Sequence, residues 1–285
     1  MRSSCYRNDD FMGEGFRLKS QRFRGQISQG LILPLSILPQ DREYELGEDV
    51  TELLGVRKWE IEDKVTSSGT AIGELPHGIP KTDEMRVQSF PELIDEFAGK
   101  PYYISTKMDG TSVTMYQMDG NFGVCGRNFE YADDGKCAFW EYAKMLGLPE
   151  KLKAATEGKE ELFPKNLALQ GEFCGGGIQK NRLKLKHPEW YVFTAIDLST
   201  HRRLSLDRML KICDELGLQH VPIEEQGEAF PYGSVEELLE RARGKYPSGM
   251  YKEGIVIRPP EPVYSPTLSA PLSMKVLNND YLLKG

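Results

Sequence analysis

The chain has 285 residues, enough to bury a substantial core in one large domain or in two smaller ones. Its five cysteines are odd in number and lack the paired spacing of zinc sites and secreted disulfide scaffolds, so we expect reduced thiols and a cytoplasmic protein. The net charge of -7 argues against indiscriminate binding to nucleic acid, although a local basic stripe can still contact phosphates. No stretch has the pattern of a signal peptide or a membrane span, so no membrane partner is expected.

The N-terminal part of the chain is predicted to be a short unit of its own. Residues 16–33 alternate in places like strands, and Asp49–Leu54 could form one or two helical turns. From residue 64 the composition shifts to Thr, Ser, Gly and Pro, which is typical of a linker. We therefore predict an N-terminal segment over 1–64, a linker over 65–80 and a main domain over 81–285.

The main domain mixes strand-like and helix-like patterns in irregular order. Strands are predicted at 102–106, 112–117, 122–127, 167–173, 190–197 and 253–258, and helices near 90–98, 136–146, 206–216 and 234–243. This mixture predicts an α+β fold with largely antiparallel sheets. The chain has no P-loop and no GxGxxG fingerprint, so a nucleotide would have to be held by other means.

The most informative motif, Lys107-Met108-Asp109-Gly110, follows the first of these strands. Tyr102–Thr106 is aromatic and β-branched, and the Asp-Gly pair provides a bend. A lysine in this place can act as a nucleophile if its surroundings favour the neutral amine, an option that arginine lacks. Taken alone, the tetrapeptide is better explained by a hairpin with an exposed lysine.

Glu172 and a glycine run form the next candidate site. Glu172 follows the apolar run 167–169, so its carboxylate would lie at a strand end, where it could meet a ribose hydroxyl or a hydrated metal. An ordinary exposed glutamate is the alternative. The three glycines at 175–177 either allow a ligand to approach the backbone or mark a flexible loop.

A basic segment covers residues 180–187 and includes Lys180. If it is extended, Arg182, Lys184 and Lys186 share one face. Cations on one face suit a nucleic-acid backbone, so these four residues are the predicted nucleic-acid contacts. An edge strand that its charges protect from pairing is the alternative.

The last third of the chain adds a base-binding candidate, an acid and a lysine. The strand 190–197 could cover one face of a base with Phe193 or Ile196, which point to opposite faces; we favour Phe193. Glu253 precedes a short apolar strand. Lys275 lies on a strand near the C-terminus, where it could contact a phosphate or face solvent.

In order and spacing, these segments resemble the motifs of the covalent nucleotidyltransferases, which comprise ATP-dependent DNA and RNA ligases and mRNA capping enzymes. Lys107-Met108-Asp109-Gly110 is similar to their nucleophile motif, and the later matches are Glu172, the strand through Asp197, Glu253-Gly254 and Lys275. The sequences KMDGTS, GRN, GEFCGGGIQKNRL and KVLNNDYL look most like RNA ligases, especially the Deinococcus-type family with an N-terminal OB-like domain. The resemblance covers residues 80–285.

The resemblance implies a fold and a reaction. The fold is an adenylyltransferase domain of largely antiparallel sheets with flanking helices, preceded here by a short partial OB-like β segment. In the reaction, Lys107 attacks the α-phosphate of ATP, AMP passes to an RNA 5′-phosphate, and a 3′-hydroxyl displaces AMP. Such phosphoryl transfers depend on positioning and charge neutralisation.

The resemblance also implies residue roles. Asp109 and Glu253 would hold a hydrated Mg²⁺ or Mn²⁺ at the α-phosphate, and Gly110 would permit close approach of the nucleotide. Glu172 would reach the ribose or a metal-bound water, and Lys275 would neutralise the α-phosphate. The remaining nucleotide contacts would be Arg86 at the triphosphate, Arg127 at the ribose and Phe193 at the adenine.

Two departures from the family pattern qualify these expectations. Ser273 stands where these ligases often carry the first of two lysines, so Lys275 lacks its usual partner. The N-terminal segment looks too short for a complete OB-like domain. We therefore expect adenylylation of Lys107 to survive while sealing is weakened or needs a partner chain; robust sealing of a nicked RNA duplex by this chain would refute that second half.

The expected substrate is RNA with 5′-phosphate and 3′-hydroxyl ends, free or at a nick. The chain ends just after the last motif, where DNA ligases and capping enzymes usually carry a further OB domain, and this favours an RNA ligase. The alternatives are a DNA ligase, a capping-type guanylyltransferase, and a non-catalytic RNA-end-binding protein that retains the nucleotide pocket.

Overall fold

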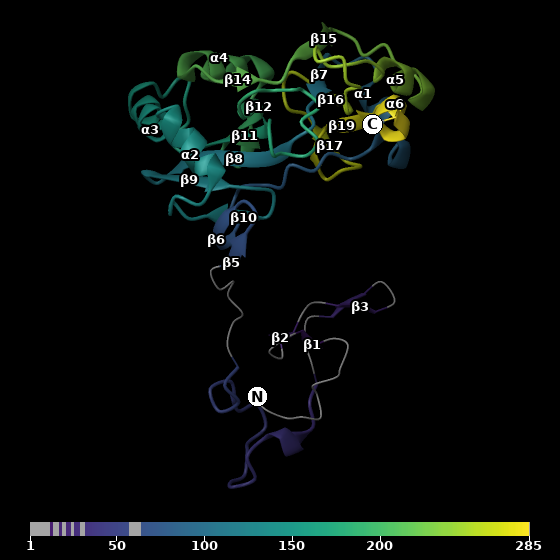
Figure 1. Cartoon of the computed structure of the whole chain (residues 1–285). Coiled ribbons are helices and arrows are strands. Elements are labelled where there is room, and N and C mark those ends of the chain that lie inside the picture. The colour runs from purple at the N-terminus through teal and green to yellow at the C-terminus, as the bar shows by residue number, and fades with distance from the viewer. Residues whose placement is uncertain are drawn as a thin grey trace. The chain divides into compact units, whose positions relative to one another are not determined.

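The computed structural model describes residues 32–56 and 64–284, together with four short strands between residues 12 and 28. The chain divides into two compact units, Met1–Glu60 and Ile61–Gly285. Figure 1 traces both units.

Short antiparallel strand pairs characterise the N-terminal unit. Its described elements are β1 (Met12–Gly13), β2 (Arg17–Leu18), β3 (Gln21–Phe23), β4 (Gln26–Ser28) and the 3-10 helix η3 (Leu35–Ile37). β1 pairs with β2, and β3 with β4. The N–H of Leu54 donates to the carbonyl of Val50 at 3.0 Å, so the predicted helical segment forms a single turn. Strands lie inside the predicted range 16–33, while the OB-like identity of the unit stays a prediction.

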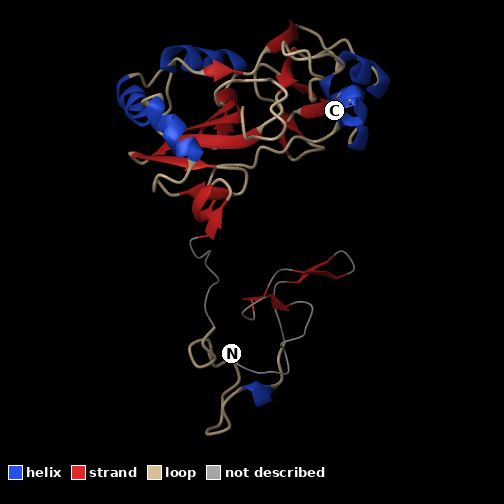
Figure 2. Cartoon of the chain, in the orientation of Figure 1, coloured by secondary structure: helices blue, strands red, loops and turns tan. Residues whose placement is uncertain are grey.

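The second unit is built on two sheets that are largely antiparallel (Figure 2). The larger sheet has the order β13-β12-β11-β8-β9-β10-β6-β5, and β14 pairs with β12 in parallel. Its strands are β5 (Lys64–Thr66), β6 (Gly69–Glu74), β8 (Thr111–Met118), β9 (Asn121–Cys125), β10 (Phe129–Tyr131), β11 (Leu167–Cys174), β12 (Glu189–Asp197), β13 (Arg202–Arg203) and β14 (Gln219–His220).

The smaller sheet has the order β15-β7-β16-β19 and contains the strand that ends at Lys107. Its strands are β7 (Tyr102–Lys107), β15 (Ile223–Gly227), β16 (Gly254–Arg258) and β19 (Met274–Leu277), and a separate pair is formed by β17 (Tyr264–Ser265) and β18 (Ala270–Pro271). The chain leaves this sheet after Lys107 and enters the larger one at Thr111. The tetrapeptide turn therefore joins the two sheets.

Helices flank both sheets (Figure 1). They are α1 (Leu93–Phe97), α2 (Ala138–Met145), α3 (Leu148–Gly158), α4 (Leu206–Leu216), α5 (Val235–Arg241), α6 (Asn279–Lys284) and the 3-10 helix η4 (Val87–Ser89). α4 follows its prediction to the residue because Ser205 caps its first turn and Gly217 ends it in the left-handed conformation at φ +67°. None of the described helices combines the length and apolarity needed to cross a bilayer.

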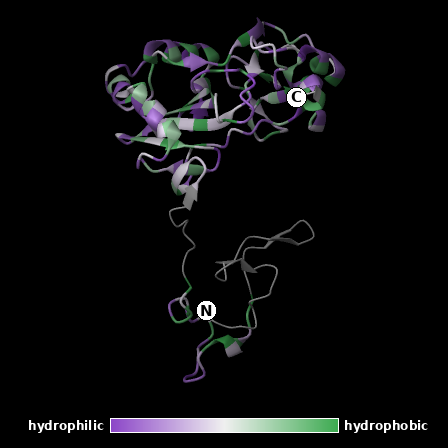
Figure 3. Cartoon of the chain, viewed as in Figure 1, coloured by the Kyte–Doolittle hydropathy of each residue, from purple (hydrophilic) through white to green (hydrophobic). Residues whose placement is uncertain are grey.

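Two apolar cores correspond to the two sheets. One packs α2, α3 and α4 against the larger sheet and contains Phe173 and Trp190; the other packs α1 and α5 against the smaller sheet and contains Phe97 and Ile104. Hydrophobic residues recur along the central strands (Figure 3). The predicted α+β fold with largely antiparallel sheets is confirmed.

The predicted linker over 65–80 is wrong at its start. β5 and β6 pair with each other, and β6 pairs with β10 in the larger sheet. The Ser and Gly residues there form the tight turn of a hairpin: Gly69 has φ +138°, and the N–H of Ser68 donates to the Thr66 hydroxyl. Turn residues and linker residues share a composition, so composition alone did not distinguish them.

Candidate active site

All five predicted catalytic residues, Asp109 included, line one cavity of about 380 Å³, whose walls come from both sheets. Lys107 ends β7, Glu253 directly precedes β16, and Lys275 lies on β19. In the ladder, Gly254 pairs with Lys107, and Val256 lies between Ser105 and Lys275. Glu172 reaches the same cavity from β11 of the other sheet. The motifs that are scattered in sequence are thus adjacent in space.

Lys107 is held in an ion pair at the cavity wall. Its Nζ lies 2.7 Å from Oε2 of Glu253, and the two side chains are only 21% and 19% exposed. An amine and a carboxylate at this distance can exchange a proton directly. Glu253 is therefore the nearest base to the amine of Lys107 among the described ion pairs.

Glu172 is the most strongly perturbed acid of the cavity. Burial raises the pKa of Glu172 to about 7, with a further push from Glu253, while Lys107 and the N–H of Gly110 oppose the shift. Glu172 can therefore gain or lose a proton near neutral pH. Acids with such shifts are typical of functional sites, although ion-pair networks produce them too.

Lys275 completes the positive side of the site. Burial and the neighbouring charge of Lys107 both lower the pKa of Lys275. Its N–H donates to the carbonyl of Met85 at 2.8 Å, which brings the strand beside Arg86. Arg86 itself is exposed and does not line the cavity, so its predicted contact with a triphosphate stays a prediction.

The competing adenine candidates occupy different environments. Phe193 lines the cavity, whereas Ile196 is 4% exposed and packs in an apolar cluster on the other face of β12. Arg127 also reaches the cavity, where it pairs with Asp83 at 2.7 Å. The geometry therefore supports Phe193 over Ile196 as the side chain on which the adenine base could stack.

Gly110 is required by packing within the protein. A Cβ on Gly110 would lie 2.4 Å from the carbonyl oxygen of Phe173 and 2.7 Å from Sγ of Cys174. No side chain fits between the tetrapeptide turn and β11. Gly110 also lines the cavity, so its predicted nucleotide contact remains a prediction beside this packing role.

Asp109 lines the cavity and is hydrogen-bonded through both of its carboxylate oxygens. Nη1 of Arg182 donates to its Oδ2 at 2.8 Å, and the hydroxyl of Tyr281 donates to its Oδ1 at 3.1 Å. The guanidinium also lies 4.2 Å over the Tyr281 ring. Both oxygens are engaged and 6% of the residue is exposed, so Asp109 would contact a hydrated metal through water, and this role stays a prediction.

The basic segment 180–187 is not extended. Asn181 and Lys184 have φ of +44° and +54°, and the side chain of Asn181 bonds both the N–H and the carbonyl of Leu185. Arg182 is consequently turned inward to Asp109, so the predicted shared face of three cations is wrong. Lys180, Lys184 and Lys186 are exposed, and RNA contact by them stays a prediction.

Ser273 lies in a setting that accounts for its small side chain. Its hydroxyl donates to Glu84, whose other oxygen pairs with the buried Arg258 at 2.5 Å. Glu84 already has a cationic partner there, so a lysine at position 273 is not needed for charge balance. Neither Glu84 nor Arg258 was assigned a role from the sequence.

The acids of the cavity suit a loosely held divalent cation. Among the described residues, no three or more His, Cys, Asp or Glu side chains form a metal cluster. Mg²⁺ at phosphoryl-transfer sites commonly uses one or two carboxylates and completes its shell with water and substrate phosphates. Glu253 and Glu172 line the same cavity and interact electrostatically, so they fit such an ion.

Comparisons with known proteins support this chemistry. Residues 100–276 match the RNA ligase family. A solved point variant of Naegleria gruberi RNA ligase with ATP and Mn is 34% identical over 94% of this chain and 75% of that one, with a TM-score of 0.67. The same ligase with PPi is 34% identical over 94% and 76%, with a TM-score of 0.65. No curated protein matches the chain.

The family match spans more than half of the chain, and the solved ligases share its fold at 34% identity. The predicted nucleotidyltransferase-type fold and the predicted RNA ligase identity are thus confirmed. The chain belongs to the RNA ligase family.

Proposed function

We propose that this RNA ligase uses ATP and forms its covalent intermediate, a lysyl-AMP, on Lys107. The observation that carries the proposal is the convergence of Lys107, Glu253, Glu172 and Lys275 on one cavity. The similar RNA ligase structures with ATP, AMP or PPi and with Mn support the choice of nucleotide and of a divalent metal.

In the first step, Nζ of Lys107 attacks the α-phosphorus of ATP. A nitrogen–phosphorus bond forms, the bond from that phosphorus to the bridging oxygen breaks, and pyrophosphate leaves. Nζ must also lose a proton, and the carboxylate of Glu253 lies 2.7 Å away to accept it. Lys275, on the other side of β16, would neutralise charge that develops on the α-phosphate.

Glu253 and Glu172 would hold a divalent cation, which when bound supplies positive charge at the phosphates. Phe193 would cover the base, and Arg127 would contact the ribose, since both line the cavity. The cavity is large enough for a nucleotide by the usual range of small-molecule sites.

In the later steps, AMP passes to an RNA 5′-phosphate and a 3′-hydroxyl displaces it. The exposed cations Lys180, Lys184 and Lys186 would bind the RNA backbone near the cavity. The motif variants KMDGTS and GEFCGGG support a Deinococcus-type ligase. A cytoplasmic location and help from a partner chain in sealing belong to the same proposal.

The test is incubation of the protein with Mg²⁺ and α-labelled ATP or GTP. We expect a covalent label from ATP on the wild type and none on Lys107→Ala. Label from GTP instead would support a capping-type enzyme. No label from either nucleotide would support a non-catalytic RNA-binding protein and overturn the proposal.

A further inference from the structure

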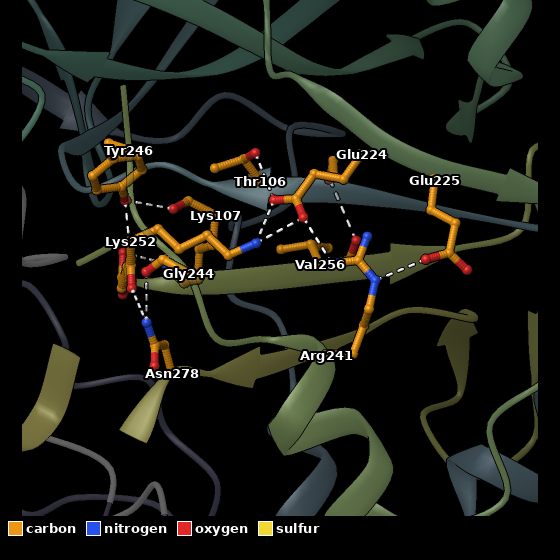
Figure 4. A network of polar contacts seen from close by, with 12 residues as sticks. Thr106, Lys107, Glu224, Glu225, Arg241, Gly244, Tyr246, Lys252, Val256 and Asn278 are labelled. Atoms are coloured by element: carbon orange, nitrogen blue, oxygen red, sulfur yellow. Dashed lines mark hydrogen bonds and ion pairs between the residues drawn. The ribbon is translucent and has the colours of Figure 1, made fainter. Parts of the chain in front are cut away.

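A second lysine–glutamate pair is connected to the first through the adjacent residues Lys252 and Glu253. Lys252, which precedes Glu253, pairs through Nζ with both oxygens of Glu224 at 2.6 and 2.7 Å. Thr106, which precedes Lys107, donates its hydroxyl to the same carboxylate at 2.8 Å. Figure 4 shows these groups meeting at Glu224. Thr106 and Lys252, which precede Lys107 and Glu253, are therefore joined through the carboxylate of Glu224.

The hydroxyl of Tyr246 joins the reactive residues themselves. It donates to the carbonyl of Lys107 at 2.7 Å (Figure 4). It also accepts from the N–H of Glu253 at 3.1 Å. Tyr246 is 4% exposed, so both of these hydrogen bonds are shielded from water. One oxygen atom thus links the backbones of Lys107 and Glu253.

Asn278 holds Glu253 from its other side. The backbone N–H of Asn278 donates to the carbonyl of Glu253 at 2.9 Å, and its side-chain amide donates to the carbonyls of Lys252 and Gly244. Glu253 lies just outside β16, where regular ladder bonds no longer fix the backbone. Its position therefore depends on Tyr246 and Asn278.

These contacts control the geometry that the first reaction step needs. Proton transfer and in-line attack are sensitive to displacements of about 1 Å in the reacting groups. The β7–β16 ladder sets the register of Lys107 and Gly254, but the residues at its end can fray without further bonds. Glu224 and Tyr246 supply those bonds.

We infer that Tyr246 and Glu224 are positioning residues for lysine adenylylation: they fix the distance between Nζ of Lys107 and the carboxylate of Glu253. The inference rests on the proposed function. It assigns these residues no contact with ATP, metal or RNA.

The decisive variant is Tyr246→Phe, which removes one oxygen and keeps the ring. We expect the single-turnover rate of lysyl-AMP formation at saturating ATP to fall about tenfold, the scale of one lost hydrogen-bonding group at a reacting centre. The KM for ATP should stay within about twofold, because no nucleotide contact is removed. Joining of RNA that already carries a 5′-adenylate should fall less, since Lys107 is not the nucleophile there.

Tyr232→Phe is the matched control. Its hydroxyl bonds Glu225 at 3.0 and 3.1 Å in the neighbouring part of the network, and among the described residues it has no hydrogen bond to Glu224, Lys107 or Glu253. This variant should lose comparable stability and keep the wild-type rate of lysyl-AMP formation. Circular dichroism and the fraction of protein that can be adenylylated at long times correct both rates for unfolded protein.

The outcomes separate the inference from the proposed function. If the wild type forms no lysyl-AMP, the proposed function fails first. If the wild type reacts and folded Tyr246→Phe reacts equally fast, or if Tyr232→Phe slows equally, the inference alone is overturned. Should Tyr246→Phe not fold, Thr106→Val takes its place, because it removes the hydroxyl that anchors the nucleophile strand to Glu224. Thr106 also lines the cavity, so a several-fold slower reaction with an unchanged KM for ATP supports the inference, whereas an unchanged rate or a raised KM overturns it.

Discussion

Two lysine–glutamate pairs of nearly equal length, Lys107–Glu253 and Lys252–Glu224, are connected through the adjacent residues Lys252 and Glu253, and they have different surroundings. Lys107 and Glu253 meet at 2.7 Å on the cavity wall. Lys252 and Glu224 meet at 2.6 Å, with the lysine side chain only 7% exposed. Thr106 and Arg241 also bond Glu224, and Arg241 in turn bonds Glu225 (Figure 4).

The comparison shows that the surroundings of a lysine decide its role. Burial raises the pKa of Glu224, but the hydrogen bonds from Lys252, Thr106 and Arg241, together with the charge of Lys252, outweigh it and keep this pKa below its ordinary value. Lys107 instead opens on a cavity with a second acid and a second lysine, where a ligand can replace its partner. The first arrangement stabilises a strand pair, and the second is suited to chemistry.

The largest expected effect is on the reaction rate and concerns the pair of Lys107 and Glu253 at the cavity wall. Glu253→Gln should slow lysyl-AMP formation about a thousandfold, because it removes the base beside Lys107, as is usual for a lost general base. Its free energy of unfolding should change by less than about 1 kcal/mol, since the pair is open to solvent on one side. Single-turnover labelling and urea titration measure the two quantities. A rate within tenfold of the wild type would contradict this role.

The pair of Lys252 and Glu224 should respond in the opposite way, with a loss of stability. Lys252→Met should lower the free energy of unfolding by about 3 kcal/mol, because it leaves the carboxylate of Glu224 without its main partner. The matched control is Lys211→Met on α4, which breaks an exposed pair with Asp207 of 2.7 Å and should cost less than about 1 kcal/mol. Equal losses for the two variants in urea titration would mean that burial does not distinguish the pairs.

Titration of Glu172 sharpens the comparison without any ligand. Its pKa of about 7 in the folded protein lies above the ordinary 4.5, so the folded state binds this proton more tightly than the unfolded chain. The stabilisation is fully present below pH 4.5 and is lost as pH rises through about 7. The Tm of Glu172→Gln minus that of the wild type should therefore grow by about 5 °C between pH 5 and 8 in EDTA. A constant difference would rule out the raised pKa.

The smallest expected effect is on RNA affinity and concerns the exposed lysines of residues 180–187. Lys184→Ala and Lys186→Ala should each weaken RNA binding two- to threefold at about 0.15 M salt and lower the salt slope by about one phosphate contact. Lys151→Ala, an exposed lysine on α3, is the control. Fluorescence anisotropy at several salt concentrations measures this, and slopes equal to that of the wild type would remove these lysines from the interface.

Much of this arrangement is predictable from the sequence because its signals are local. Strand runs such as Tyr102–Lys107 carry the aromatic and β-branched residues that favour sheets, and α4 has a serine cap and a terminal glycine. The resemblance to ligases provided the order of the catalytic motifs. The lysine of the nucleophile motif and its acidic and basic neighbours could thus be named before the structure.

The contacts that distinguish the two pairs were not predictable in this way. Tyr246 and Lys107 are 139 positions apart, and Thr106 and Glu224 are 118 apart, so no local pattern reports them. The alternation of leucine and lysine over 180–187 is compatible with a strand. It is equally compatible with the loop observed, which buries Arg182 against Asp109. Periodicity cannot detect the left-handed residues that turn this segment.

The central claim is that Lys107, and no other lysine, becomes the reactive one. Its most direct test is mass spectrometry of the protein after incubation with ATP and Mg²⁺, with peptides mapped under conditions that preserve the phosphoramidate bond. The account predicts one AMP adduct on the peptide that carries Lys107, absent from Lys107→Ala. An adduct on Lys252 or another lysine, or one that persists in Lys107→Ala, would contradict it.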